Sequence, residues 1–167
     1  MNKPVIKIYT DGSCHTNFKI GAWAAILLFA NEKVVFKGEA QNTTHNRMEM
    51  LAVIKGIEFA DKKYDKASLV IYTDSQYVYR ISERKEKLKE KHFLTKKGIP
   101  IQNSDLVKTL IFQIETHAIE FIKVKAHQQP EKGLLNASVK GYVNYNCEVD
   151  KLARAMVREC INRGYQD

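Results

Sequence analysis

The sequence predicts an α/β protein built on a mixed β-sheet. Three apolar segments come first and are separated by turn signals, which favours neighbouring antiparallel strands. Two further strand-like segments follow, each preceded by segments with helical spacing of apolar residues. The resulting order, β-β-β-α-β-α-α-β-α, is typical of a sheet that is antiparallel at one side and crossed by helices.

The first half of the chain supplies the antiparallel strands and one buried helix. Residues 4–10 are expected to form a strand that ends at the Asp-Gly-Ser turn signal at 11–13. Residues 21–29 and 33–37 are apolar on either side of a polar break, which predicts a hairpin. In the segment 43–61, apolar residues lie nearly all the way round the predicted helix, so we expect most of it to be buried.

Strands and helices alternate in the second half. The predicted elements are a strand at 67–72, a short helix at 75–81, a helix at 105–116 capped by Ser104, a strand at 118–124, and a last helix whose apolar stripe covers 149–160. A long loop is expected at about 128–145, because proline and glycine interrupt this stretch.

Length and composition indicate one globular domain spanning residues 1–167. Hydrophobic residues make up 44% and charged residues 28% of the chain, and no apolar run approaches the roughly 20 residues that span a bilayer. The N-terminus lacks a signal-peptide core, so we expect a cytoplasmic protein without a membrane partner. The three cysteines (Cys14, Cys147 and Cys160) are too widely spaced to suggest a disulfide framework or a zinc site.

An excess of basic residues suggests a polyanionic partner. The net charge is +8, which favours nucleic acid first and an acidic membrane surface second. Residues 84–97 concentrate this charge, with seven basic residues against two glutamates. Such a segment is either a solvated helix face with ion pairs or an arm that grips phosphates; we favour a basic arm at about 83–99.

Four acidic residues form a candidate catalytic group. Asp11 and Asp74 each follow a predicted strand, where ligands of α/β sheets gather. Glu49 shares a helix face with small and apolar residues, and Asp150 lies at the predicted start of the last helix. Each has a structural alternative: an N-cap for Asp74, a capping box for Glu49 and a helix-dipole partner for Asp150. Together the four would suit two Mg²⁺ ions, although periodicity alone does not bring them together.

Five short pieces, in order, resemble a type 1 ribonuclease H. They are Tyr-Thr-Asp-Gly-Ser-Cys at 9–14, Asn-Arg-Met-Glu-Met at 46–50, Tyr-Thr-Asp-Ser-Gln-Tyr-Val at 72–78, Val-Lys-Ala-His at 124–127 and Cys-Glu-Val-Asp-Lys-Leu-Ala-Arg at 147–154. The stretch 94–103 is similar instead to retroviral ribonuclease H domains. The resemblance implies a five-stranded mixed sheet and hydrolysis of the RNA strand of RNA/DNA hybrids, leaving 3′-hydroxyl and 5′-phosphate ends.

The resemblance also assigns roles to individual residues. It implies that Asp11, Glu49, Asp74 and Asp150 hold two Mg²⁺ ions, for which we expect Mn²⁺ to substitute. His127 matches a histidine thought to assist proton transfer or product release.

Further residues match the family's substrate contacts. Asn17, Asn46 and Gln76 correspond to polar residues near the minor groove, where the 2′-hydroxyl distinguishes RNA from DNA. Thr44 corresponds to a residue of the DNA-phosphate pocket. The basic arm occupies the place of the family's basic protrusion, so we expect backbone contacts from Arg84, Lys85, Lys87 and Lys89. We expect the protein to act as a monomer.

Three departures and three alternatives accompany this resemblance. Residues 18–20 (Phe-Lys-Ile) replace the usual glycine-rich turn, the arm lacks tryptophan, and the loop before Asp150 is long. The alternatives are another nuclease on the same fold, such as a resolvase or integrase, a non-catalytic hybrid-binding module, and a domain of a longer reverse transcriptase. The four acids argue against a non-catalytic module, and the pieces at 46–50 and 72–78 argue against a different nuclease.

Overall fold

The computed structural model describes residues 3–126 and 144–164. Within these ranges the predicted order of strands and helices is confirmed: β1 (Val5–His15), β2 (Ile20–Phe29), β3 (Glu32–Gln41), α1 (His45–Lys63), β4 (Ser68–Thr73), α2 (Gln76–Glu90), α3 (Ser104–Thr116), β5 (Ala118–Lys123) and α4 (Tyr145–Gly164). None of the helices in this part of the chain is long and apolar enough to span a membrane.

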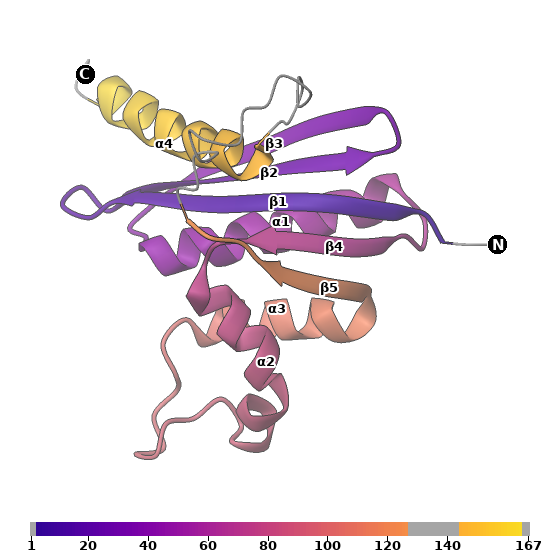
Figure 1. The fold of residues 1–167 in the computed structure, drawn as a ribbon. Coiled ribbons are helices and arrows are strands. Elements are labelled where there is room, and N and C mark those ends of the chain that lie inside the picture. The colour runs from indigo at the N-terminus through magenta and orange to yellow at the C-terminus, as the bar shows by residue number, and fades with distance from the viewer. Residues whose placement is uncertain (1–2, 127–143, 165–167) are drawn as a thin grey trace.

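The five strands form one mixed sheet in the order β3-β2-β1-β4-β5 (Figure 1). The hairpin partners β2 and β3 are antiparallel, and β2 also pairs antiparallel with β1. On its other side β1 pairs parallel with β4, and β4 pairs parallel with β5. The strand β1 is therefore the centre of the sheet, with one antiparallel and one parallel neighbour.

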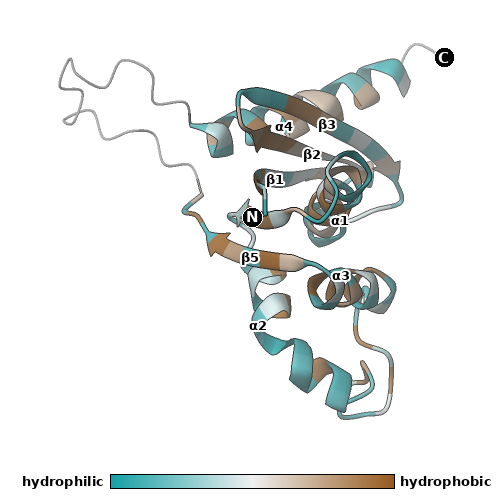
Figure 2. Ribbon diagram, turned by 90° about the vertical axis from the view of Figure 1, so that its right-hand side faces the viewer, coloured by the Kyte–Doolittle hydropathy of each residue, from teal (hydrophilic) through white to brown (hydrophobic). Residues whose placement is uncertain are grey.

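Helices cover the sheet on both faces (Figure 2). The helix α1 packs on β1 and β2 and also contacts α3, whereas α4 lies across β1 and β2 on the opposite face. Alternate residues of β1 serve the two layers: Ile6 and Ile8 belong to the core beneath α1, and Tyr9 packs with the smaller cluster beneath α4. A central strand with both faces covered needs apolar residues on both sides, as the sequence of β1 provides.

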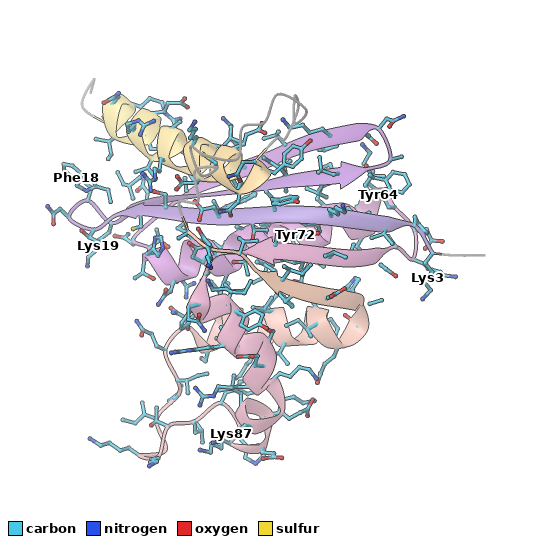
Figure 3. All side chains as sticks on the ribbon, viewed as in Figure 1. Lys3, Phe18, Lys19, Tyr64, Tyr72 and Lys87 are labelled. Carbon is cyan, nitrogen blue, oxygen red and sulfur yellow. The ribbon has the colours of Figure 1, made fainter. Side chains whose placement is uncertain are left out.

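The predicted end of β1 at residues 11–13 is wrong, because the strand runs on to His15. Asp11 and Gly12 are paired with Ala24 and Trp23 of β2. A Cβ atom at Gly12 would lie 2.4 Å from the backbone nitrogen of Glu49, so glycine is needed here for the close approach of α1. The chain reverses only at residues 16–19, the turn that carries Phe18 and Lys19 (Figure 3).

The helix α2 is longer than predicted. It continues without a break past residue 81 to Glu90, so the first half of the predicted arm is a regular helix. Figure 3 shows Lys87 on the part of α2 that projects away from the sheet. Up to Glu90, the alternative of a solvated helix face therefore describes the conformation of this segment.

Two other helix starts also differ from the prediction. The helix α4 begins at Tyr145, four residues before the predicted stripe, and Glu148 rather than Asp150 is the acid of its first turn. Asp150 therefore does not act at the helix terminus, and the dipole alternative for it is wrong. The helix α3 includes Ser104, and Asn103 is the residue before it, without a side-chain cap.

Candidate active site

Parallel pairing of β1 with β4 brings two of the predicted acids together. The last parallel pair joins Thr10 to Thr73, so Asp11 and Asp74 follow at the same edge of the sheet. Asp74 is not the N-cap of α2; the Ser75 side chain accepts the backbone hydrogen bond of Val78 instead. The N-cap alternative for Asp74 is therefore wrong.

The helix α1 adds Glu49 to this edge. Thr44 caps α1 by accepting a hydrogen bond from the Arg47 backbone, so a capping box would need an acid at 47 rather than at 49. Glu49 lies on the side of α1 that approaches Gly12 and is buried. The capping alternative for Glu49 is therefore wrong, and its carboxylate is placed beside that of Asp11.

Three carboxylates meet at this point. One oxygen each from Asp11, Glu49 and Asp74 lies within 4.8 Å of the others. These three acids line a cleft, which Asp150 also lines from α4. There, Asp150 Oδ1 forms an ion pair with Arg154 Nε at 2.8 Å. The structure thus brings together all four predicted acids, three in a tight group and Asp150 alongside them.

The electrostatics of the group favour a bound cation. Burial, followed by repulsion from the three other carboxylates, raises the pKa of Asp11 to about 10. Burial also raises the pKa of Glu49, although its hydrogen bond with His45 opposes this shift. Without a cation, Asp11 therefore keeps a proton at neutral pH.

The donor set fits a hard divalent cation. Glu49 Oε2 is buried and has no hydrogen-bond partner among the described residues. A buried carboxylate oxygen without a donor is costly unless a cation binds it. Mg²⁺ and Mn²⁺ prefer oxygen ligands of this kind, so the group is a suitable site for either.

The structure adds His45 and Arg80 to the cleft, and the sequence prediction missed both. His45 lies one helical turn before Glu49, and its Nε2 is 3.2 Å from Glu49 Oε1. The hydrogen bond with Glu49 raises the pKa of His45. The spacing of four residues between His45 and Glu49 on a predicted helix was the signal that could have identified this pair.

The structure places some of the predicted substrate contacts in the cleft and others at exposed positions beside it. Asn46 and Gln76 line the cleft together with Arg80. Asn17 lies in the exposed turn between β1 and β2, and Thr44 is the exposed cap of α1. A hydrogen bond from Thr43 N to Lys19 O joins this turn to the start of α1. His127 lies outside the described residues.

The basic residues of α2 have different environments. Lys85 forms an ion pair with Glu86, and Lys89 forms one with Glu115. Arg84 and Lys87 are exposed and have no ion pair among the described residues. With Arg80, Arg84 lines a largely apolar groove next to the acidic cleft, so it is the better placed of the four for a backbone contact.

Comparisons of the chain with known proteins all indicate the same family. The family model described as RNase H matches residues 3–158. A protein named ribonuclease H from Thermoanaerobacter sp. (strain X514) is 36% identical over 159 residues, which cover 94% of this chain and 92% of that protein. A protein of the same name from Methylobacillus flagellatus is 41% identical over 129 residues, which cover 76% of this chain and 83% of that protein. The fold is similar to the crystal structure of LC9-RNase H1, a type 1 RNase H with the type 2 active-site motif, with a TM-score of 0.76, 20% identity and coverage of 95% of this chain and 74% of that one. The chain therefore belongs to the ribonuclease H family.

Proposed function

We propose that the protein is an endoribonuclease that hydrolyses the RNA strand of RNA/DNA hybrids and requires a divalent cation, with Mg²⁺ as the first choice. Membership of the ribonuclease H family supports a hydrolytic nuclease. The observation that carries the proposal is the meeting of three carboxylates within 4.8 Å in an open cleft. Such a group destabilises a metal-free protein, so its presence is best explained by a catalytic cation.

The four acids are the proposed ligands of two cations. Asp11, Glu49 and Asp74 would supply the central oxygens and Asp150 a further one from α4, and Mn²⁺ would substitute for Mg²⁺. Bound there, the cations would lower the pKa of an attacking water and stabilise charge on the departing 3′-oxygen, leaving 3′-hydroxyl and 5′-phosphate ends. The chain itself contributes rigidity, because Asp11 and Glu49 are held by the packing of β1 against α1. His127 is proposed to assist proton transfer or product release.

Polar residues on either side of the acids are proposed to select the hybrid. Asn46 on α1 and Gln76 on α2 both line the cleft, and their amides can contact 2′-hydroxyls and base edges in a minor groove. Asn17 lies in the β1–β2 turn and Thr44 lies just before α1, and the hydrogen bond from Thr43 N to Lys19 O joins these two segments. Both residues are proposed to extend this contact. Arg84 and its neighbours on α2 would bind the phosphate backbone without regard to sequence.

The test is cleavage of an RNA/DNA hybrid labelled on its RNA strand. Duplex RNA, duplex DNA and single-stranded RNA are run beside it, each with Mg²⁺ and with EDTA. We expect cutting of hybrid RNA alone, in Mg²⁺ alone, and its loss in Asp74→Asn. The exposed Asp61, which pairs with His117 away from the cleft, offers the matched control variant Asp61→Asn.

Two results would contradict the proposal. Tight binding of the hybrid without cutting in Mg²⁺ or Mn²⁺ would favour a non-catalytic binding module. Equal cutting of duplex DNA or of branched DNA would favour a different nuclease on this fold. Analysis of the product ends tests the 3′-hydroxyl and 5′-phosphate assignment separately.

A further inference from the structure

His45 is a residue of the cleft whose side chain contacts a proposed cation ligand. Its Nε2 lies 3.2 Å from Glu49 Oε1, while Glu49 Oε2 is buried without a described partner. We propose that His45 is a positioning residue, whose ring N–H holds Oε1 and so leaves Oε2 free for the cation. This inference rests on the cation site proposed above.

The two oxygens of Glu49 are in different situations, and this difference carries the argument. A carboxylate on a flexible side chain can present either oxygen, or both, to a cation, so its orientation must be fixed by other contacts. Partners of metal ligands commonly provide such a contact, and their loss weakens metal binding by about 10–100-fold. Here the side chain of Glu49 is only 3% exposed and that of His45 is 61% exposed, so the donor reaches in from the cleft surface.

The first turn of α1 is fixed independently of the cleft. Thr44 caps the turn through the Arg47 backbone nitrogen. On another side, the Arg47 guanidinium donates to both oxygens of Asp105 on α3, at 3.0 and 2.9 Å. His45 is therefore presented to Glu49 from a backbone held at two points, as a positioning role requires.

Two other roles for His45 are a direct contact with the nucleic acid and transfer of a proton during cleavage. Both would reduce cleavage when His45 is replaced, as would the loss of a positioning contact. Only the positioning role predicts weaker cation binding in the absence of any nucleic acid. Cation binding by the free protein is therefore the measurement that separates the three roles.

The experiment compares Mn²⁺ binding to the free protein by calorimetry. His45→Phe keeps a ring but removes the donor, and His45→Gln keeps an amide N–H of similar reach. We expect His45→Phe to bind Mn²⁺ about tenfold more weakly, and His45→Gln to stay within about threefold of the parent protein. The matched control is His117→Phe, because His117 makes the same contact with Asp61, also at 3.2 Å, away from the cleft. Thermal unfolding of each variant shows that it has folded.

Each outcome decides the inference. Parental Mn²⁺ affinity in His45→Phe would overturn it, and reduced cleavage in that variant would then indicate a substrate or proton-transfer role, with the proposed function intact. Equal weakening in His45→Phe and His45→Gln would also overturn the donor role. Absence of Mn²⁺ binding by the parent protein would remove the cation site itself, and the inference with it.

Discussion

The acidic cleft and the basic helix α2 differ in how far their charged groups are exposed to water. In the cleft, Asp11 and Glu49 are 4% and 3% exposed and stand close to carboxylates of the same sign. On α2, Arg84 and Lys87 are in contact with solvent, and other lysines are paired with glutamates. Charges interact strongly where water is excluded and weakly where it is not. A single acid of the cleft should therefore matter far more than a single base of the helix.

Replacing a buried acid should give the largest effect. The variant Glu49→Gln keeps the shape of the side chain but removes the charge that would bind a cation. We expect single-turnover cleavage of hybrid RNA to fall at least about 10³-fold, because cation stabilisation of the transition state is worth several kcal/mol. The control on the same helix is Glu58→Gln, since Glu58 pairs with Lys55 and lies outside the cleft. Parental activity in Glu49→Gln would remove Glu49 from the catalytic group.

The same burial predicts how stability depends on pH in the metal-free protein. The folded state raises the pKa of Asp11 from 3.8 to about 10, so folded Asp11 holds a proton that the unfolded chain releases. The free energy of unfolding in EDTA should therefore fall as the pH rises through this interval. Denaturant unfolding at several pH values measures this dependence.

The variant Asp11→Asn isolates the contribution of that carboxyl group. In EDTA at about pH 8 we expect its free energy of unfolding to exceed that of the parent by at least about 1.4 kcal/mol, the equivalent of one pKa unit. Mg²⁺ should stabilise the parent more than this variant, because binding to the folded state alone raises stability. The exposed control Asp61→Asn should behave like the parent. An Asp11→Asn protein that is less stable than the parent at high pH would contradict the raised pKa.

On α2 the expected effects are smaller and depend on salt. The variant Arg84→Ala should weaken hybrid binding at low salt and reduce the slope of log affinity against log salt by about one charge. Lys89→Ala should do less, because Lys89 already pairs with Glu115. Titration of a labelled hybrid at several salt concentrations measures both. A larger effect for Lys89 than for Arg84 would show that the ion pairs of α2 open when substrate binds.

The same contrast explains what could be predicted from sequence. The strands and helices follow from local periodicity, and Asp74 was placed correctly because its strand does end there. The prediction of a turn at Gly12 is wrong. Glycine is needed there because the backbone of Glu49, which is distant in sequence, approaches it too closely for a Cβ atom. The meeting of Asp11 with Asp74 likewise depends on the parallel register of two strands, which no local pattern encodes.

Charge density predicted the structure less well than the periodicity of apolar residues did. The lysine-rich segment after residue 81 was interpreted as a separate arm, although lysine and glutamate are good helix formers and α2 continues through it to Glu90. Arg80 was overlooked because it precedes the dense basic stretch, yet it lines the cleft. The rotation of α2 about its own axis, relative to the sheet, decides which of its exposed basic side chains face the substrate. That rotation is set by packing and not by composition.

The end of α2 gives the smallest predicted effect. Phe93 N donates to Leu88 O and His92 N donates to Lys89 O, both at 2.9 Å, and His92 has φ +50°. These bonds form the helix ending in which glycine is usual at the left-handed position.

We expect His92→Gly to raise the free energy of unfolding by about 0.5–1 kcal/mol, because glycine adopts this conformation without the steric cost that histidine bears. The matched control is the preceding residue, Lys91, whose φ is −87°. Lys91→Gly should bring no gain, because a side chain is tolerated there and glycine only adds freedom to the unfolded chain. Denaturant unfolding of both variants measures the difference, and equal or reversed effects would mean that the strain at His92 is relieved elsewhere in the arm. Because His92 is exposed and lies outside the cleft, cleavage should be unchanged, so the basic helix can be stabilised without altering the acidic site.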